Sequence, residues 1–371
     1  MKYFIGIVLF TLLFISQIYA QEFSSSSGLI KVITIAKGLE HPWGFVFLPD
    51  DRILVTERPG RLRIISKNGD LSDPIQNLPK VYNEGQGGLL DIALDPNFTQ
   101  NHFIYFSYAE EIDGKAGTAV AQATLNDRVL ENVKVIFRQY PKVIGDNHWG
   151  SRLVFAKDGT LFITLGERFD YRDKAQDLST DLGKIVHINK DGTPASNNPF
   201  LHQKNVLPEI WSYGHRNVQG AILNPDTGIL WAAEHGPRGG DEINIIEAGK
   251  NYGWPQASYG SHYTGVPIPD EHASHGFIEP IYHWTPSISP SGMMFYTGDR
   301  FPQWKNNLFL GALSGECLIR LEIKENKIVK EERLLQDLEE RIRDIQQGPD
   351  GLIYLITDND DGRILRLEPS N

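Results

Sequence analysis

The sequence has a single cysteine, Cys317, among its 371 residues, so no disulfide can form within the chain. Stability must therefore come from a hydrophobic core and from bound ions. Beyond the first twenty residues there is no long apolar run, so we expect a mature protein without a membrane span. Positive charge is also scarce. The formal net charge of −11 argues against a nucleic-acid partner and is compatible with calcium or small neutral molecules.

Several common catalytic fingerprints are missing as well. The glycine-rich strings precede apolar strand patterns rather than helices, which excludes a P-loop and a dinucleotide-binding fingerprint. Neither a serine nucleophile elbow nor an HExxH metal motif occurs in the chain. Helix signals are sparse, and we expect only a short helical turn within residues 174–184. The fold is therefore predicted to be all-β.

The first twenty residues have the pattern of a secretory signal peptide. Lys2 precedes an apolar run over 3–15, and a short stretch of mixed polarity ends at Ala20, where we expect cleavage. An uncleaved membrane anchor is the alternative, but the apolar run is short for a span. We predict an exported, periplasmic protein in which residues 21–28 form a serine-rich tether and residues 29–371 form one domain.

What the sequence does contain is an internal repeat. Six segments share an apolar strand, a turn rich in Pro, Asp, Asn and Gly, and a second apolar strand. Another strand follows the first, fifth and sixth copies, at 61–66, 317–324 and 362–368. The six copies occupy residues 44–58, 90–108, 152–167, 220–234, 292–312 and 342–358.

Six such units, spaced by roughly fifty to seventy residues, predict a six-bladed β-propeller. A ring of this kind closes on itself and leaves few exposed strand edges. A β-sandwich is the alternative, but the repeated turn chemistry at blade-sized intervals disfavours it. We expect residues 29–35 to complete the last blade. The longest loops fall between the third and fifth copies, so we expect a ligand site there.

Polar, glycine-containing strings stand directly before three of the repeated strands. Gln86 precedes the second copy, His148 the third, and Arg216 with Asn217 the fourth. Because each string leads into the first strand of its copy, all three are predicted to open at one end of the propeller. A histidine can titrate near neutral pH and act as a general base, although most histidines are structural. Beside a guanidinium and two amides, His148 favours a functional site.

Two loops carry further candidate ligand groups. The run at 234–254 combines glycine and proline turns, which free backbone carbonyls, with the carboxylates of Asp241 and Glu242. Calcium prefers oxygen ligands of this kind, and a rigid loop with surface acids is the alternative. In the loop at 282–292, Trp284 is available to cover a flat ligand, with packing in the core as the alternative.

Arg341 and Arg343 lie two positions apart at the start of the sixth copy, so they share one face of a strand. Guanidiniums pair well with carboxylates and phosphates. Two of them on one face, together with Arg216, predict a ligand that bears several such anionic groups.

Taken together, these strings resemble the soluble, pyrroloquinoline quinone (PQQ)-dependent aldose sugar dehydrogenases of the glucose/sorbosone dehydrogenase family. The strings are HWGSR at 148–152, HRNVQG at 215–220, EHGPRGGDEIN at 234–244, NYGW at 251–254 and RIRD at 341–344. The resemblance extends over about residues 38–367, and the family fold is a six-bladed propeller. It implies that an aldose is oxidised at C1 to a lactone and that electrons pass to an external acceptor, such as a quinone, a cytochrome or a dye.

The resemblance also implies roles for individual residues. His148 would take the proton of the anomeric hydroxyl while a hydride moves from C1 to the C5 carbonyl of PQQ. A calcium ion, held partly by the carbonyls of Gly236 and Pro237, would polarise that carbonyl. Arg216 would stabilise the negative charge that develops on the quinone oxygen. The other expected cofactor contacts are Gln86, Asn147, Asn217, Tyr263, Trp284, Arg341 and Arg343.

A second, structural calcium is implied at Glu242 and the carbonyl of Tyr252. One departure from the family pattern is Ser314, because many relatives have Lys or Arg there in contact with the cofactor. Loss of one charge-assisted hydrogen bond weakens binding by about 1.5–3 kcal/mol where nothing compensates. We therefore expect a working enzyme with weaker cofactor affinity. A metal-dependent propeller lactonase and a secreted propeller binding module remain the alternatives, and the preferred sugar and the oligomeric state stay open.

Overall fold

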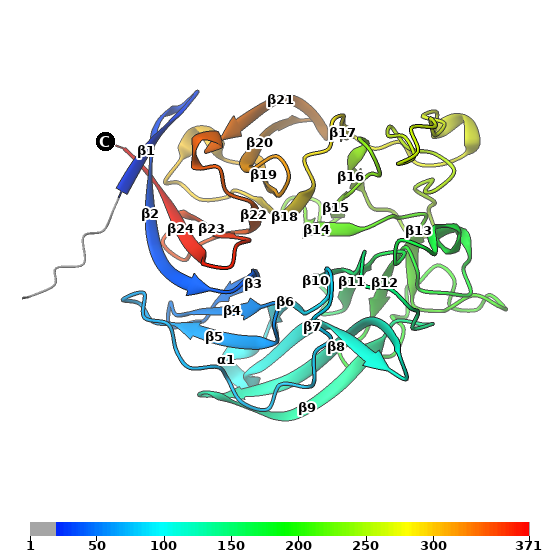
Figure 1. The fold of residues 1–371 in the computed structure, drawn as a ribbon, viewed down its shortest axis with the longest axis horizontal. Coiled ribbons are helices and arrows are strands. Elements are labelled where there is room, and N and C mark those ends of the chain that lie inside the picture. Colours follow the sequence, from blue (N-terminus) through cyan, green and yellow to red (C-terminus); the bar gives the residue numbers. More distant parts are fainter. Residues whose placement is uncertain (1–19, 371) are drawn as a thin grey trace, which may run out of the picture.

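The structure, a computed structural model, describes residues 20–370. Residues 1–19, nearly all of the predicted signal peptide, lie outside this range. Six antiparallel sheets stand around a central axis, which confirms the predicted six-bladed β-propeller (Figure 1). Within residues 20–370, no helix is long and apolar enough to cross a membrane.

The first five blades each begin at the axis and add strands outward in chain order. The first holds β3 (Pro42–Phe47), β4 (Ile53–Glu57) and β5 (Arg61–Ile65), and the second holds β6 (Leu89–Leu94), β7 (Phe103–Ile112), β8 (Lys115–Asn126) and β9 (Val129–Arg138). The third holds β10 (Gly150–Phe155), β11 (Leu161–Leu165), β12 (Lys184–Ile188) and β13 (Ile210–Tyr213). The fourth holds β14 (Val218–Leu223), β15 (Leu230–Glu234), β16 (Asp241–Ile245) and β17 (Tyr282–Trp284). The fifth holds β18 (Pro290–Phe295), β19 (Leu308–Ala312), β20 (Cys317–Lys324) and β21 (Lys327–Leu334).

The sixth blade joins the two ends of the described chain, as Figure 1 shows in blue and red. Its sheet order is β1-β2-β24-β23-β22, with β22 (Ile342–Gln347), β23 (Ile353–Thr357), β24 (Gly362–Pro369), β2 (Gly28–Leu39) and β1 (Ala20–Ser25). The expectation that residues 29–35 complete the last blade is therefore confirmed. Pairing of β2 with β24 closes the ring without a covalent link.

The predicted serine-rich tether at 21–28 is wrong. These residues form β1 and a tight turn into β2, with register pairs from Ala20↔Ile33 to Ser25↔Gly28. Phe23 packs against the hydrophobic core, and the hydroxyl of Ser27 accepts a hydrogen bond from the Trp304 indole at 3.1 Å. The open edge of β2 supplies backbone partners, so a polar, serine-rich stretch is ordered as an edge strand.

The repeated turns fold as their sequences predict. In the third blade Gly159 adopts a φ of +86°, and Asp158 accepts a hydrogen bond from the backbone N–H of Thr160 at 3.0 Å. This Asp-Gly turn joins β10 and β11, as the turn composition of the repeat predicts.

The helices among the described residues are short. They are α1 (Phe98–Asn101) and four single 3-10 turns, at Arg172–Gln176, Ala273–His275, Pro302–Trp304 and Gln336–Leu338. The 3-10 turn at Arg172–Gln176 corresponds to the helical turn expected within residues 174–184 and begins two residues earlier.

Every inner strand carries a register shift near its start. The shifts lie at Pro42/Phe45, Leu89/Ile92, Gly150/Leu153, Val218/Gly220, Pro290/Met293 and Ile342/Asp344. A bulge of this kind adds a residue and turns side chains away from the regular alternation. Residues within or beside the bulges are consequently aimed at the axis, where the six inner strands converge.

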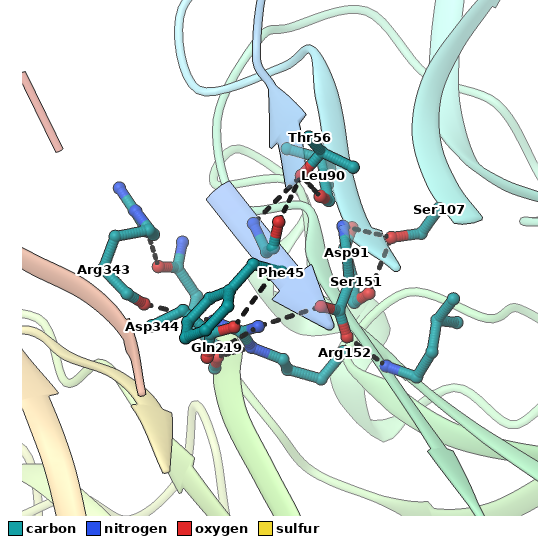
Figure 2. A network of polar contacts seen from close by, with 12 residues as sticks. Phe45, Thr56, Leu90, Asp91, Ser107, Ser151, Arg152, Gln219, Arg343 and Asp344 are labelled. Carbon is teal, nitrogen blue, oxygen red and sulfur yellow. Dashed lines mark hydrogen bonds and ion pairs between the residues drawn. The ribbon is translucent and has the colours of Figure 1, made fainter. Parts of the chain in front are cut away.

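A buried polar network closes the axis at this level (Figure 2). The guanidinium of Arg152 lies between two carboxylates, 2.9 Å from Asp91 and 3.1 Å from Asp344. It also donates to the backbone carbonyls of Gln219 and Arg343 at 2.7 and 3.2 Å. Burial raises the pKa of Asp344 to about 6 although Arg152 opposes the shift. Because its groups come from four blades, the network fixes the inner strands relative to one another. We call these residues, Asp91, Arg152 and Asp344, the axial network.

Candidate active site

The predicted strings do open at one end of the propeller. His148 precedes β10, Arg216 and Asn217 precede β14, and Arg343 lies in the bulge of β22. Gln86 belongs to the loop that leads into β6, and its side-chain oxygen accepts the backbone N–H of His148 at 2.9 Å. Loops from the second, third, fourth and sixth blades therefore share this end.

His148 is held in a defined orientation. Its imidazole is 5% exposed, and Nδ1 lies 2.8 Å from the Oε2 atom of Glu167. The edge of Phe169 packs on the ring with centroids 5.1 Å apart. Glu167 also accepts the Trp254 indole N–H at 3.2 Å. A carboxylate on Nδ1 selects the tautomer that has its lone pair on Nε2. The arrangement therefore suits a base that acts through Nε2.

The electrostatic surroundings keep this imidazole neutral. Burial, first of all, lowers the pKa of His148, and the positive charge of Arg216 lowers it further. The hydrogen bond to Glu167 opposes the shift by stabilising the imidazolium. General-base catalysis requires a histidine that is neutral before the reaction and whose protonated form is stabilised, here by the carboxylate of Glu167.

Arg216 is buried and charged, yet it has no carboxylate partner for its side chain. Its guanidinium donates to the carbonyls of His235 and Gly236 at 3.0 and 2.7 Å and to the Tyr263 hydroxyl at 3.0 Å. Its Nε atom has no partner among the described residues. Burial of an arginine with an unused donor is costly unless a ligand completes it.

Asn217 shows the same feature. It is fully buried, and its side-chain oxygen accepts the backbone N–H of Gly150 at 3.0 Å, while its Nδ2 atom has no partner within residues 20–370. Asn147 differs, because its amide donates to the neighbouring Asp146 at 3.1 Å. Asn147 thus lies next to the base in the chain, with its amide engaged by a protein partner.

A cavity of about 490 Å³ opens beside these groups. Arg216, Glu167 and Phe169 contribute to its wall, and the last two contact His148 directly. Tyr263 also lines the cavity and is 61% exposed. The rest of the wall consists of Asp170, Arg172, Pro237, Trp254, His262, Thr264 and Val266.

Trp284 does not belong to this cavity, so its predicted role as a cofactor contact is wrong. The ring is 4% exposed within the core between the fourth and fifth blades, and its indole N–H donates to Glu331 at 2.8 Å. Trp284 is the last residue of β17, the outermost strand of its blade, and two strands separate β17 from the inner strand β14. Core packing, the alternative at the sequence level, is what the structure shows. Trp254 is the tryptophan of the cavity wall.

The predicted arginine pair is divided between two environments. Arg343 is buried and bonds the Gln219 side chain at 2.7 Å and the carboxylate of Asp358, with its Nε atom left without a partner among the described residues. Arg341 is 44% exposed and lies 3.6 Å from Asp358. Both arginines thus share one carboxylate, which leaves excess positive charge at this end of the propeller.

The predicted calcium ligands fall into two places. The carbonyl of Gly236 already accepts from Arg216, and Pro237 lines the large cavity. Glu242 and Tyr252 line a second cavity of about 10 Å³, the size of one ion or water, together with Glu234 and with Gly236 itself. Burial and then the charge of Glu234 raise the pKa of Glu242 well above its usual value. Within residues 20–370 no group of three or more His, Cys, Asp or Glu side chains is arranged to hold a metal.

Three residues of the site, Glu167, Phe169 and Trp254, were not predicted from the sequence. A signal for the first was present, because a glutamate stands at or just after the end of the second strand in three repeats, at Glu57, Glu167 and Glu234. The structure places all three at the same end of the ring, and two of them hold a histidine, with Glu234 2.9 Å from His215. Phe169 has no such signal, since its position depends on a left-handed backbone at φ +66°.

Comparison with known proteins identifies the family of this chain. Residues 39–366 match the model of the family described as Glucose / Sorbosone dehydrogenase. The aldose sugar dehydrogenase YliI of Escherichia coli (strain K12) is 44% identical over 348 residues, 92% of this chain and 94% of that protein. The chain belongs to the glucose/sorbosone dehydrogenase family.

Two solved structures extend the comparison. A crystal structure of glucose dehydrogenase is 49% identical and has a TM-score of 0.88, with 91% of this chain and 99% of that chain covered. The PQQ-bound form of aldose sugar dehydrogenase from Streptomyces coelicolor is 31% identical with a TM-score of 0.78, covering 91% and 97% of the two chains. The family resemblance seen in the sequence is thus confirmed.

Proposed function

We propose that this protein is a PQQ- and calcium-dependent aldose dehydrogenase that oxidises the sugar at C1 to a lactone and passes the electrons to an external acceptor. The observation that carries the proposal is a set of buried donors without protein partners. Arg216 Nε, Asn217 Nδ2 and Arg343 Nε all lie at the end of the propeller that holds the paired histidine and glutamate.

The donor set fits PQQ. This cofactor is a planar quinone with three carboxylates, so its rim consists largely of hydrogen-bond acceptors. Guanidinium and amide donors that burial has removed from water are suited to such acceptors. The family structure with bound PQQ, at 31% identity, supports the same assignment. Arg216 and Asn217 would hold the quinone side, while Arg341 and Arg343 would pair with carboxylates and Gln86 would bond the substrate or the cofactor edge.

When bound, PQQ supplies the quinone carbonyl that accepts the hydride from C1 of the sugar. The protein supplies the base. With Nδ1 bonded to Glu167, Nε2 of His148 takes the proton of the anomeric hydroxyl, and Glu167 stabilises the resulting imidazolium. Arg216 adds positive charge where negative charge develops. Phe169 and Tyr263, 40% and 61% exposed at the cavity, offer apolar faces to the sugar ring.

Calcium is proposed at both predicted places. The carbonyls of Gly236 and Pro237 would hold an ion that acts as a Lewis acid on the quinone. A structural ion would use Glu242 and the Tyr252 carbonyl in the ion-sized cavity. There a cation would offset the repulsion between Glu242 and Glu234, two carboxylates that both accept from the Asn244 amide, at 3.3 and 3.2 Å.

We also propose that the protein is exported and acts in the periplasm, as its first twenty residues indicate. The external acceptor, whether a quinone, a cytochrome or an artificial dye, would take the electrons at the same open end of the propeller. The cavity there is the entry that the structure offers to both sugar and acceptor.

The test is dye reduction by purified mature protein with glucose and other aldoses, with PQQ and calcium each added or omitted. Activity should require both additions and should be lost when a chelator removes calcium. Lactone hydrolysis with metal alone would favour the hydrolase alternative. Neither activity, with no change of melting temperature on addition of PQQ, would contradict the proposal and favour a binding module.

A further inference from the structure

A further arginine, Arg58, lies at the same end of the propeller but was not among the predicted site residues. It occupies the turn between β4 and β5 in the first blade. Its guanidinium donates to the carbonyls of Gly87, at 3.2 Å, and Gly85. Between these two glycines stands Gln86, whose side chain accepts the backbone N–H of His148. Arg58 is therefore fixed beside the loop that supports the base.

On its other side Arg58 is linked to the carboxylate that the predicted arginine pair shares. Its backbone N–H donates to the carbonyl of His41 at 3.1 Å, and Nδ1 of His41 lies 2.8 Å from Asp358. Burial lowers the pKa of Arg58, the charge of Asp358 raises it, and the charge of Arg341 lowers it. The charges of both Arg341 and Arg58 likewise lower the pKa of Arg343. The three guanidiniums are thus close enough to repel one another across the space between the first and sixth blades.

The local charges do not balance. Among the described residues, Asp358 is the carboxylate that faces all three arginines, and it is already bonded to Arg343 and to His41, at 2.8 Å from the latter. Arg58 is bonded only to backbone carbonyls and has no ion pair within residues 20–370. The three guanidiniums outnumber the carboxylate that they share, and an anionic ligand would neutralise the excess positive charge.

Ser314 lies next to this cluster as well. The carbonyl of its neighbour Leu313 accepts from Arg341 at 3.4 Å, and the hydroxyl of Ser314 is 2.9 Å from that of Ser289. The position therefore borders the arginines, as the family pattern implies, but contributes no charge. A compensating cation must come from elsewhere in the chain.

We infer that Arg58 binds a carboxylate of the cofactor and supplies, from the first blade, the positive charge that is missing at Ser314. The inference rests on the proposed function, because it takes PQQ as the ligand. The guanidinium of Arg58 is partly exposed and is already oriented by the carbonyls of Gly85 and Gly87, so its side chain loses little freedom when the ligand binds. The anion site then has three arginines for a ligand with three carboxylates.

The test is a binding titration of the full-length mature protein with PQQ in calcium buffer, followed by fluorescence quenching, without substrate. Wild type is compared with R58M, with R58K and with the control R52M, whose arginine pairs with Asp50 in the turn at the opposite end of the same blade. Each protein is titrated from about 0.05 to about 1 M salt, because screening weakens a charge contact but not a purely structural one. R58M should bind PQQ about tenfold or more weakly at low salt. R58K should lose less, and R52M should bind as wild type does.

The difference between R58M and wild type should shrink as salt rises. Equal affinity of R58M and wild type at low salt would overturn the role of Arg58 and leave the proposed function standing. A loss that is the same at every salt concentration, or as large in R58K, would also overturn it, since it would indicate distortion of the 85–87 loop. Failure of wild type to bind PQQ would overturn the proposed function itself, and the inference with it.

Discussion

Two buried arginines, Arg152 in the third blade and Arg216 just before the fourth, show how the same type of side chain can serve structure or function. In the axial network, Arg152 lies between Asp91 and Asp344, and its donors bond protein acceptors (Figure 2). At the open end, Arg216 bonds carbonyls and a tyrosine, has no carboxylate for its side chain and keeps Nε without a partner among the described residues. A completed network fixes the blades. An incomplete one, placed beside a cavity, indicates where a ligand belongs.

The largest effect should come from the base. His148→Ala should reduce kcat by about 10²–10⁴-fold, because the proton of the anomeric hydroxyl would lose its acceptor. PQQ affinity should stay within a few-fold of wild type, since the unpartnered donors remain. Steady-state dye reduction and PQQ titration measure the two quantities, with His275→Ala, an exposed histidine, as the matched control. Unchanged turnover would remove His148 from the mechanism.

The axial network should respond in stability rather than in binding. Arg152→Met should lower the free energy of unfolding by about 3–5 kcal/mol, because it leaves two buried carboxylates without their cation. Arg216→Met should cost the cofactor-free protein less, as it removes a charge that no carboxylate neutralises, while weakening PQQ binding. Denaturant unfolding of both variants without PQQ gives the comparison.

Arg52→Met, which breaks an exposed ion pair, should change stability by at most about 1 kcal/mol and serves as the control. If Arg216→Met proved as destabilising as Arg152→Met, the contrast between a completed and an incomplete network would be wrong.

Glu167→Gln should shift the pH dependence of catalysis. The carboxylate raises the pKa of His148 against the effects of burial and Arg216. A neutral amide stabilises the imidazolium less, so the folded-state pKa falls further below its ordinary value. The acid limb of kcat/KM, which reports protonation of the base, should move to lower pH while kcat decreases. Profiles from about pH 4.5 to 8 measure both.

The exposed Glu84→Gln is the matched control for this profile and should leave the limb in place. An acid limb that stayed where it is in wild type, or that moved to higher pH, would show that Glu167 does not act on His148 in this way.

The smallest effect is expected at Ser314. Ser314→Lys places a cation beside Arg341 and the proposed carboxylate site, and should tighten PQQ binding by up to about tenfold. The gain should be modest if Arg58 already compensates. Affinity from the same titration decides the question, and a looser complex would mean that residue 314 does not border the cofactor.

The sequence was sufficient for the architecture because the information is local and repeated. Each hairpin has its own alternation and its own turn rich in Pro, Asp, Asn or Gly, so six similar segments predicted six blades and the end at which the polar strings meet. The strand at 20–25 was missed for the opposite reason. Its composition is that of a linker, and only the open edge of β2 makes it a strand.

The candidate site could be predicted only in part. His148, Arg216 and Asn217 stand in glycine-containing strings just before strand starts, and Arg343 stands at the start of β22, so their common end of the propeller could be predicted. Trp284 was misplaced because a tryptophan in a Pro/Ser loop does not reveal whether it faces the core or a cavity. The position of Phe169 depends on a left-handed backbone, and that of Arg58 depends on contacts between blades that are far apart in the sequence. Neither has a local signature.

The central claim is that the unpartnered donors at the open end form the cofactor site. A crystal structure of the mature protein with PQQ and calcium tests it most directly. The account predicts one PQQ in the cavity beside His148, with acceptor atoms within hydrogen-bond distance of Arg216 Nε, Asn217 Nδ2 and Arg343 Nε. PQQ bound elsewhere on the propeller, or those three donors still without partners in a saturated complex, would contradict it.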